Sequence, residues 1–353
     1  MKLSFIAGAR WQDWQRLRKE NPVPPRYWHR SMLQTLLSSR NEKLAKLDDQ
    51  VNLAAVAPEP PIFILGHWRS GTTHLQYLLS QDPAFGVPNN YQCCFPSSCL
   101  KSEEEHGRQI ARWVPARRLQ DNMAQSLKTP GESEMALAAL GAPTPYLSWA
   151  FPQRSEHFLR FLSLRDATNA ERSAWKAAME YCVRKWTWIY RRPLLLKSPS
   201  NTARIRWLLE LFPDARFVHI HRHPLEVYQS SLHLYRVWKS RIAFLQRPDF
   251  SCMEDRILHL YQEMHKALEA DKGLIPPGNY HAMRFEELER NPLGELQSLY
   301  ESLRLGDPPL NFLKKYLENI RLYKKNNYPK LKRAERDRVT EAWGPWLRGW
   351  GYT

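Results

Sequence analysis

Four segments of strand length, the first two of them apolar runs, recur along the chain and are separated by stretches of helical periodicity. The four segments cover residues 62–65, 194–197, 216–221 and 280–285. Apolar positions recur at helical spacing over residues 202–211, 253–268 and 293–303, and from about residue 225. Strands that alternate with helices are typical of an α/β fold in which helices flank a parallel β-sheet. We predict this fold class, with the ligand site along the carboxyl edge of the sheet.

The regions outside this alternation have a different character. Residues 1–57 precede the first strand and contain a predicted helix over 30–47, so we interpret them as an N-terminal helical extension. Residues 58–353 then form one large domain. Within it, residues 91–190 separate the first two strands and are rich in aromatic residues. We predict that this segment is a large, mainly helical insertion that caps the site.

Composition narrows the possible partners and the location. The formal net charge of +16 calls for an anionic partner, which is nucleic acid, an acidic membrane surface or a small polyanionic ligand. No apolar stretch approaches the roughly 20 residues that a bilayer span requires, and the N-terminus lacks a signal-peptide pattern. The five Cys form no CxxC pair, so we predict reduced thiols and a cytoplasmic protein.

The segment after the first predicted strand has the features of a phosphate-binding loop. It reads Gly66-His67-Trp68-Arg69-Ser70-Gly71-Thr72-Thr73 and opens a helical pattern. Backbone amides and the positive end of a helix at such a turn cradle an anion. A Walker A loop requires Lys after its second Gly, whereas this chain has Thr72 there and carries its cation, Arg69, before Gly71. The loop therefore predicts phosphate binding and disfavours kinase chemistry.

The run Arg69-Ser70-Gly71-Thr72-Thr73 resembles the 5′-phosphosulfate loop of sulfotransferases that use 3′-phosphoadenosine 5′-phosphosulfate (PAPS). In that family a strand is followed by Lys or Arg, then by S-G-T-T and a helix. The resemblance covers about residues 61–306 and implies a P-loop-like fold of the bacterial-type branch. It implies that Arg69 contacts the 5′-phosphate and the bridging oxygen, and that Thr72 and Thr73 hydrogen-bond the phosphate.

Later segments match the same family. A strand that ends in Arg222, with Ser230 eight residues on, has the spacing of the pair that holds the 3′-phosphate in these enzymes. An Arg at a strand end can also clamp a phosphate through two parallel hydrogen bonds. Phe285 stands near the adenine position, where cytosolic relatives have Tyr, but a core aromatic fits the pattern equally well. Lys324 and Lys325 are further candidates for the 3′-phosphate, although a solvated basic run is the simpler interpretation.

The resemblance assigns the catalytic groups only in part. Sulfuryl transfer requires cations that stabilise the leaving oxygen and a base that accepts the proton of the acceptor hydroxyl. The resemblance gives the cations as Arg69 and Lys197, which ends the second predicted strand. It gives no base, because this chain has Pro199 where cytosolic relatives have His, and Asn where tyrosine-directed relatives have Glu.

Glu132 and Glu134 in the insertion are our candidates for this base. The run Thr129-Pro130-Gly131-Glu132 also fits a capping box, in which Glu132 would bond the Thr129 amide and be structural. In that case Glu134 is the better base, since two positions on a helix lie about 200° apart and only one carboxylate faces the site. The alternatives that stay open are His67, His74 and His221.

We therefore predict a PAPS-dependent sulfotransferase that acts on the hydroxyl of a small-molecule acceptor. The 14 Trp favour a hydrophobic or aromatic acceptor, although an aromatic core explains them equally well. A nucleotide-dependent kinase with a degenerate loop and a basic nucleic-acid-binding protein are the alternatives, but neither accounts for both phosphate motifs. We therefore expect no nucleic-acid partner. We also expect no metal, because Arg222 lies among His219, His221 and His223 and no carboxylate or thiolate completes a ligand set.

Overall fold

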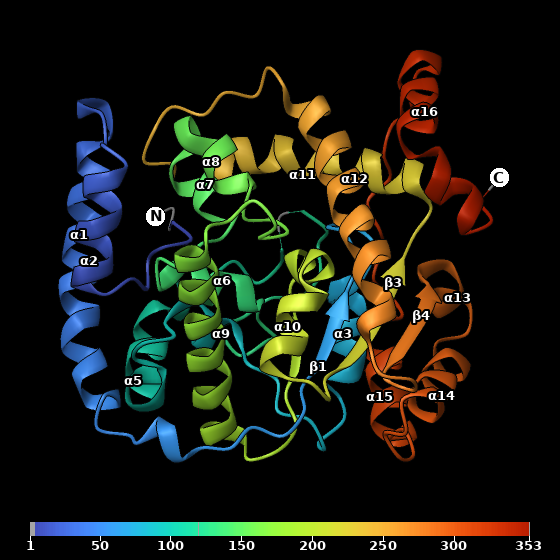
Figure 1. Ribbon diagram of the computed structural model, residues 1–353, viewed down its shortest axis with the longest axis horizontal. Helices are drawn as coiled ribbons and strands as arrows, with labels where there is room; N and C mark the ends of the chain where they lie inside the picture. Colours follow the sequence, from blue (N-terminus) through green and yellow to red (C-terminus); the bar gives the residue numbers. More distant parts are fainter. Residues whose placement is uncertain (1–3, 119, 353) are drawn as a thin grey trace.

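Four parallel strands form the central sheet, in the spatial order β2–β1–β3–β4 (Figure 1). The computed structural model describes residues 4–118 and 120–352. The strands are β1 (Ile62–Leu65), β2 (Leu195–Lys197), β3 (Arg216–His221) and β4 (Tyr280–Arg284). In register, Ile64 of β1 lies beside Lys197 of β2 and Val218 of β3. The predicted α/β fold with a parallel sheet is confirmed.

The two faces of the sheet are buried in different hydrophobic clusters. Phe63 and Leu65 of β1 belong to a cluster that includes side chains of α9 (Asn169–Tyr190) and α10 (Ile205–Leu211). Ile62 and Ile64 point the other way, into a cluster with α3 (Thr72–Leu79) and α14 (Pro292–Ser302). A strand that is covered on both faces reads as an unbroken apolar run, and this explains the pattern from which β1 was predicted.

The chain leaves β1 and β3 in opposite directions across the sheet. The next strand after β1 is β2, on one side, whereas the next strand after β3 is β4, on the other. Ligands of open parallel sheets bind at such a reversal, outside the carboxyl ends of the strands. The loops after β1 and β3 carry the two predicted phosphate motifs, so both motifs lie where the topology favours a ligand.

The remaining elements surround this sheet (Figure 1). The other α-helices are α1 (Trp11–Glu20), α2 (Trp28–Asp48), α4 (Asn90–Cys94), α5 (Cys99–Ala111), α6 (Ser133–Ala139), α7 (Leu147–Ala150), α8 (Ser155–Leu159), α11 (Pro224–Arg241), α12 (Met253–Asp271), α13 (Phe285–Arg290), α15 (Leu310–Ile320) and α16 (Arg333–Gly349). Short 3₁₀ segments lie at Pro25–Tyr27, Leu53–Ala55, Pro152–Arg154, Pro199–Ala203 and Lys272–Leu274. The 3₁₀ segment at Pro199 delays the start of α10, and Phe285 opens α13 instead of ending β4.

Much of the aromatic content fills the core. Trp14, Trp175, Trp186 and Trp343 are among the largest fully buried side chains. Trp14 comes from the N-terminal extension and Trp175 and Trp186 from α9 of the insertion, and all three join the cluster on one face of the sheet. These Trp side chains therefore belong to the hydrophobic core, and only the remaining Trp residues can contact a ligand.

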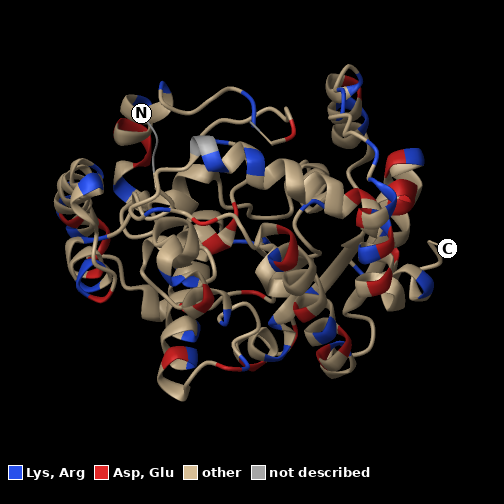
Figure 2. Cartoon of the chain, turned by 90° about the horizontal axis from the view of Figure 1, so that it is seen from above, with Lys and Arg blue, Asp and Glu red and all other residues tan. Residues whose placement is uncertain are grey.

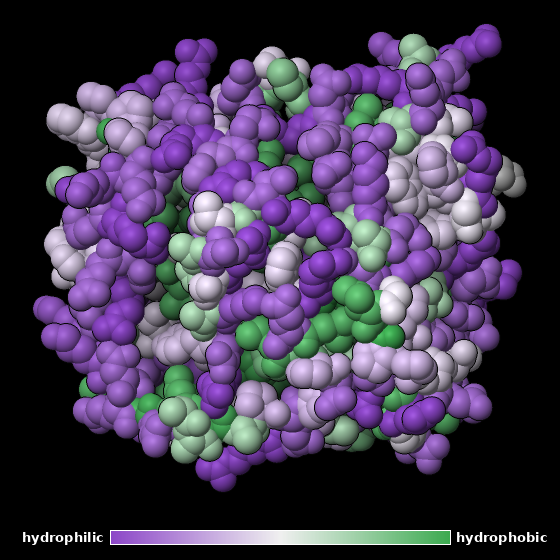
Figure 3. Space-filling view, viewed as in Figure 1, coloured by the Kyte–Doolittle hydropathy of each residue, from purple (hydrophilic) through white to green (hydrophobic). Residues whose placement is uncertain are grey.

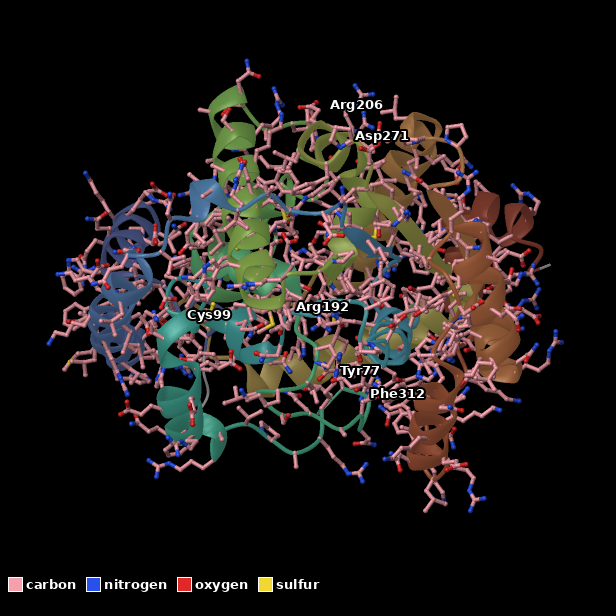
Figure 4. The ribbon with its side chains drawn as sticks, turned by 90° about the horizontal axis from the view of Figure 1, so that it is seen from below. Tyr77, Cys99, Arg192, Arg206, Asp271 and Phe312 are labelled. Atoms are coloured by element: carbon pink, nitrogen blue, oxygen red, sulfur yellow. The ribbon has the colours of Figure 1, made fainter. Side chains whose placement is uncertain are left out.

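Ion pairs tie the outer helices together, and charge is spread over the whole surface. Asp271 at the end of α12 accepts from Arg206 of α10 at 3.3 Å, and Figure 4 shows the two side chains side by side. Lys and Arg are interspersed with Asp and Glu instead of forming one block (Figure 2). All five Cys have free thiols. Among the described residues, no helix is both long and apolar enough to span a bilayer.

Candidate active site

The loop between β1 and α3 owes its shape to two glycines with positive φ. Gly66 has a φ of 144° and Gly71, the N-cap of α3, a φ of 102°. A Cβ on Gly71 would lie 2.2 Å from a ring carbon of Phe285, and one on Gly66 would lie 2.5 Å from the carbonyl oxygen of Ile220. Only Gly combines this conformation with such close approach, so both positions are fixed by geometry.

Arg69 stands at the tip of this loop in a conformation that is uncommon for a bulky residue. Its φ is +75°, in the left-handed region. The guanidinium Nε donates to Ser230 Oγ at 2.9 Å, and Nη1 contacts Asp121 Oδ2 at 3.0 Å. Strained backbone of this kind persists where the surroundings hold it, and it occurs preferentially at functional sites. The contact with Ser230 brings the two predicted phosphate motifs together.

A cavity of about 460 Å³ opens beside the loop. Its lining includes the predicted residues Arg69, Gly71, Thr72, Thr73, Arg222 and Phe285. The remaining loop residue, Ser70, is 2% exposed, and its Oγ has no hydrogen-bond partner among the residues that the structure describes. Ser70 is not part of the cavity lining, and its Oγ lies close to Gly66 within the loop. The loop amides at the start of α3 provide further donors.

Arg222 lies on the same cavity with its guanidinium 4.5 Å from the centre of the Phe285 ring. Its Nη2 is paired with Glu226 Oε2 at 2.5 Å. Ser230 Oγ, besides contacting Arg69, lies 3.0 Å from the hydroxyl of Tyr328, a residue that lines the cavity. Phe285 is 6% exposed and packs on Gly71, so it serves both the core and the cavity wall.

Lys197 and Glu132 form a second group of charged side chains. Lys197 is 3% exposed, and its Nζ lies 3.0 Å from Glu132 Oε2. Burial lowers the pKa of Lys197, although the carboxylate of Glu132 opposes this shift. Tyr146 donates its hydroxyl to Glu132 Oε1 at 2.5 Å and accepts from Trp68 Nε1 at 3.0 Å. The predicted capping box is wrong, because α6 begins at Ser133 and Glu132 points to Lys197 instead of the Thr129 amide.

Glu134 is located differently from Glu132. Its carboxylate is fully buried and is bound by Arg204 Nη1 at 3.0 Å from both oxygens. It also accepts hydrogen bonds from Ser198 and Thr144. Both carboxylate oxygens are thus occupied by protein donors, and the fully buried side chain offers no surface that an acceptor hydroxyl could reach. We therefore do not retain Glu134 as a candidate base.

Of the histidines left open by the sequence, His67 and His221 are buried and His74 is half-buried. His67 has a pKa lowered to about 4 by burial, and its Nδ1 lies 2.7 Å from the Trp68 carbonyl oxygen. His74 lines the 460 Å³ cavity beside Phe285. His221 is stacked on Trp350 with ring centres 4.5 Å apart. In the described part of the chain, no three or more His, Cys, Asp or Glu are grouped as metal ligands.

A second, smaller pocket of about 60 Å³ has mostly apolar walls. Its aromatic lining comes from Trp68, Tyr146, Trp149, Tyr235, Trp238, Phe244 and Phe250. In Figure 3 hydrophobic side chains lie at the base of a recess near the top centre, over the position of α11 in Figure 1. Ser231 is part of this lining, and its buried Oγ has no hydrogen-bond partner within residues 4–118 and 120–352.

The two cavities adjoin along neighbouring residues of the same elements. In the loop, Trp68 lines the apolar pocket while Arg69 lines the larger cavity. In α11, Ser231 lines the apolar pocket while Ser230 bonds Arg69. The arrangement can therefore hold an anionic molecule on one side of Arg69 and an apolar molecule on the other.

Comparison with known proteins identifies the family. The sequence profile described as "Sulfotransferase family" matches residues 60–309. The chain belongs to the sulfotransferase family. This sulfotransferase is 35% identical to the omega-hydroxy-beta-dihydromenaquinone-9 sulfotransferase Stf3 of Mycobacterium tuberculosis (strain CDC 1551 / Oshkosh) and of Mycobacterium bovis (strain ATCC BAA-935 / AF2122/97). The similarity covers 98% of this chain and 90% of each relative.

Solved structures confirm the fold of the sulfotransferase. Sulfotransferase STF9 from Mycobacterium avium superposes with a TM-score of 0.70 at 19% identity, covering 94% of this chain and 88% of that chain. Sulfotransferase STF1 from Mycobacterium tuberculosis H37Rv gives a TM-score of 0.64 at 16% identity, covering 95% and 93%. The predicted enzyme class is confirmed, and the kinase alternative is discarded.

The sequence did not reveal every charged group at the site of the sulfotransferase. Arg118 of the insertion donates from Nη1 to Thr73 Oγ1 at 3.0 Å and contacts Asp121 Oδ1 at 3.2 Å. Burial alone would raise the pKa of Asp121, but Arg118 and Arg69 together lower it. Lys325 lines the cavity and pairs with Glu289 at 2.7 Å. The sequence signal for Arg118 was only a basic pair in an insertion, which is too common to indicate a site.

Proposed function

We propose that this sulfotransferase transfers the sulfuryl group of PAPS to the hydroxyl of an apolar acceptor. The observation that carries the proposal is the junction of the two cavities at Trp68 and Arg69. One cavity offers a glycine loop and guanidinium groups, which suit a nucleotide phosphate. The other offers aromatic walls, which suit an apolar molecule.

The donor end is assigned to the residues of the larger cavity. The loop amides with Ser70, Thr72 and Thr73 would bind the 5′-phosphosulfate, because Thr72 and Thr73 line the cavity at the start of α3. Arg222 and Ser230 would bind the 3′-phosphate, and the Phe285 ring would lie against the adenine. Arg222 must then exchange Glu226 for the phosphate, a replacement of one anionic partner by another.

The transfer itself requires an attack of the acceptor oxygen on sulfur, opposite the oxygen that bridges sulfur and phosphorus. The new O–S bond forms as the old one breaks, and the electron pair stays on the phosphate oxygen. We assign Arg69 and Lys197 to stabilise that oxygen. We assign Glu132 to accept the hydroxyl proton, because it contacts Lys197 and, through Tyr146, the wall of the apolar pocket.

The acceptor class follows from the walls of the apolar pocket. Aromatic side chains dominate them, and no charged group other than Asp249 and Arg256 is part of the described lining. The mycobacterial relative is named for an omega-hydroxylated dihydromenaquinone. We propose for this chain an acceptor with a hydroxyl at the end of a long apolar chain, which would enter the pocket with its hydroxyl towards Trp68.

A transfer assay tests this function. Sulfur-labelled PAPS is incubated with the protein in EDTA and with matched alcohols: a long-chain isoprenoid alcohol, a phenol, a sugar and a hydroxyl-containing peptide. Labelled product with the isoprenoid alcohol, and little with the sugar or peptide, is the expected result. Preferred labelling of the sugar or the peptide would overturn the acceptor assignment, and no labelling at all would overturn the donor.

A further inference from the structure

Helix α2 of the N-terminal extension has its apolar and polar faces in an unusual arrangement. Facing the protein it buries mainly polar side chains, namely Ser31, Gln34, Ser38, Asn41 and Asp48. Facing outward it exposes Trp28, Met32 and Leu36, each at least 64% accessible. These three recur every fourth residue and so form one stripe on the helix. A surface helix ordinarily has the opposite arrangement.

The inward polar side chains hold α2 in this orientation. Gln34 Nε2 donates to the carbonyl oxygen of Ile6 at 2.8 Å, and Asn41 Nδ2 donates to that of Ala7 at 2.7 Å. Asp48 pairs with Lys185 Nζ at 2.8 Å, where both side chains are almost completely buried. Rotation of the helix to hide the apolar stripe would leave these buried groups unpaired, at a large cost. The apolar stripe is therefore a stable feature of the outer surface.

The second half of the same outward face is basic. Arg40, Lys43 and Lys46 are exposed there, one turn or more after Leu36. The nearby carboxylates, Glu42 and Asp49, are both paired with Arg10 of the extension. The face thus combines an apolar half with a positively charged half. Helices that lie in the interface of an anionic bilayer have this combination of side chains.

The extension also forms part of the surroundings of the apolar pocket. Arg30 Nη1, two residues after Trp28, donates to the carbonyl oxygen of Phe244 at 2.6 Å, and Phe244 lines the pocket. Phe5 packs on the pocket residues Tyr146 and Trp238, with ring centres 5.5 and 5.7 Å apart. The N-terminal end of α2 and the segment before α1 therefore contact the residues that enclose the apolar pocket.

We propose that the outward face of α2 docks the protein on an anionic lipid surface, from which the acceptor reaches the apolar pocket. The charge pattern favours a membrane over a second copy of the chain. In a two-fold pair, a parallel arrangement would bring the basic halves together, and an antiparallel one would bury them against Trp28 and Met32. The delivery of acceptor rests on the proposed function, whereas the lipid contact does not.

Vesicle flotation of the full chain tests the contact. The protein is mixed with vesicles of phosphatidylcholine alone or with phosphatidylglycerol, at low and high salt. We expect binding to the anionic vesicles that weakens as salt rises, since exposed Lys and Arg supply part of the attraction. Replacing Trp28→Ser, Met32→Ser and Leu36→Ser together should weaken binding at least about tenfold, because the buried apolar area is lost.

The control replaces three other exposed apolar side chains that line neither cavity, with Leu274→Ser, Leu310→Ser and Phe312→Ser. It should bind like the unmodified protein. A second variant, Lys43→Glu with Lys46→Glu, alters only exposed side chains, and its binding to anionic vesicles should also be weakened. Equal binding by both α2 variants and the control, or no binding by the unmodified protein, would overturn the proposal. So would a dimer in solution that the stripe variant dissociates.

Sulfation of a short, water-soluble alcohol separates this inference from the function. The α2 variants should keep that activity, because none of the changed residues lines either cavity. If no alcohol is sulfated while vesicle binding persists, the proposed function fails and the lipid contact stands. If an alcohol is sulfated but the protein does not bind vesicles, the proposed function stands and the lipid contact fails.

Discussion

The two carboxylates of the insertion, Glu132 and Glu134, should respond in opposite ways to removal of their charge. Replacing Glu134→Gln leaves the fully buried guanidinium of Arg204 without its partner at 3.0 Å. Breaking a buried ion pair on one side costs about 3–5 kcal/mol of unfolding free energy. An arginine cannot shed its proton to relieve that cost. We expect Glu134→Gln to be strongly destabilised yet to keep its turnover per folded molecule.

Replacing Glu132→Gln should instead reduce turnover and spare most of the stability. Its partner Lys197 can lose a proton when the carboxylate is removed, since burial already lowers the pKa of this Lys. Loss of a general base typically reduces turnover by about 10²- to 10⁴-fold. Urea unfolding and a transfer assay on both variants provide the comparison. Full turnover in Glu132→Gln, or lost turnover in a stable Glu134→Gln, would refute the assignment.

Four further outcomes follow from the site. Lys197→Ala should lower turnover about a hundredfold with a smaller effect on donor binding, and unchanged turnover would remove it from the chemistry. Adenosine 3′,5′-bisphosphate at about a hundred times its dissociation constant should add roughly 2.7 kcal/mol of stability. AMP at that concentration should add less, and Arg222→Ala should abolish the preference. Gly71→Ala should lose about 2–5 kcal/mol in urea unfolding, because its Cβ meets Phe285 and φ is positive. Stability should fall as pH drops from about 6.5 towards 4. Burial lowers the pKa of His67 to about 4 and that of His219 to about 3, so in this range the unfolded chain binds protons at these two residues and the folded chain does not. A flat urea profile over that range would contradict the burial of both rings.

The fold and the phosphate motifs could be predicted because each depends on local pattern. An unbroken apolar run indicates a strand covered on both faces, and this located β1 and β2. The Gly66 and Gly71 spacing indicates a tight loop before a helix, which the positive φ angles confirm. Parallel topology then brings the loops after β1 and β3 to the same edge, without any contact being known in advance.

The residues that depend on tertiary contacts could not be predicted. Glu132 and Glu134 are alike in sequence, and only Arg204, seventy residues after Glu134, makes one of them structural. Arg118 reaches Thr73 across a fold that no spacing rule describes. The helix over 30–47 was predicted, but its polar inward face was not, because the expected amphipathic pattern is reversed in α2.

The most direct test of the account is a crystal structure of the protein with adenosine 3′,5′-bisphosphate and an omega-hydroxylated isoprenoid. The account predicts the 5′-phosphate on the loop amides at Ser70 to Thr73, and the 3′-phosphate within hydrogen-bond distance of Arg222 and Ser230. It predicts the isoprenoid among the aromatic side chains beside Trp68, with its hydroxyl next to Glu132. A nucleotide bound outside the cavity of Arg69, or an isoprenoid whose hydroxyl points away from it, would contradict the central claim that transfer occurs at this junction.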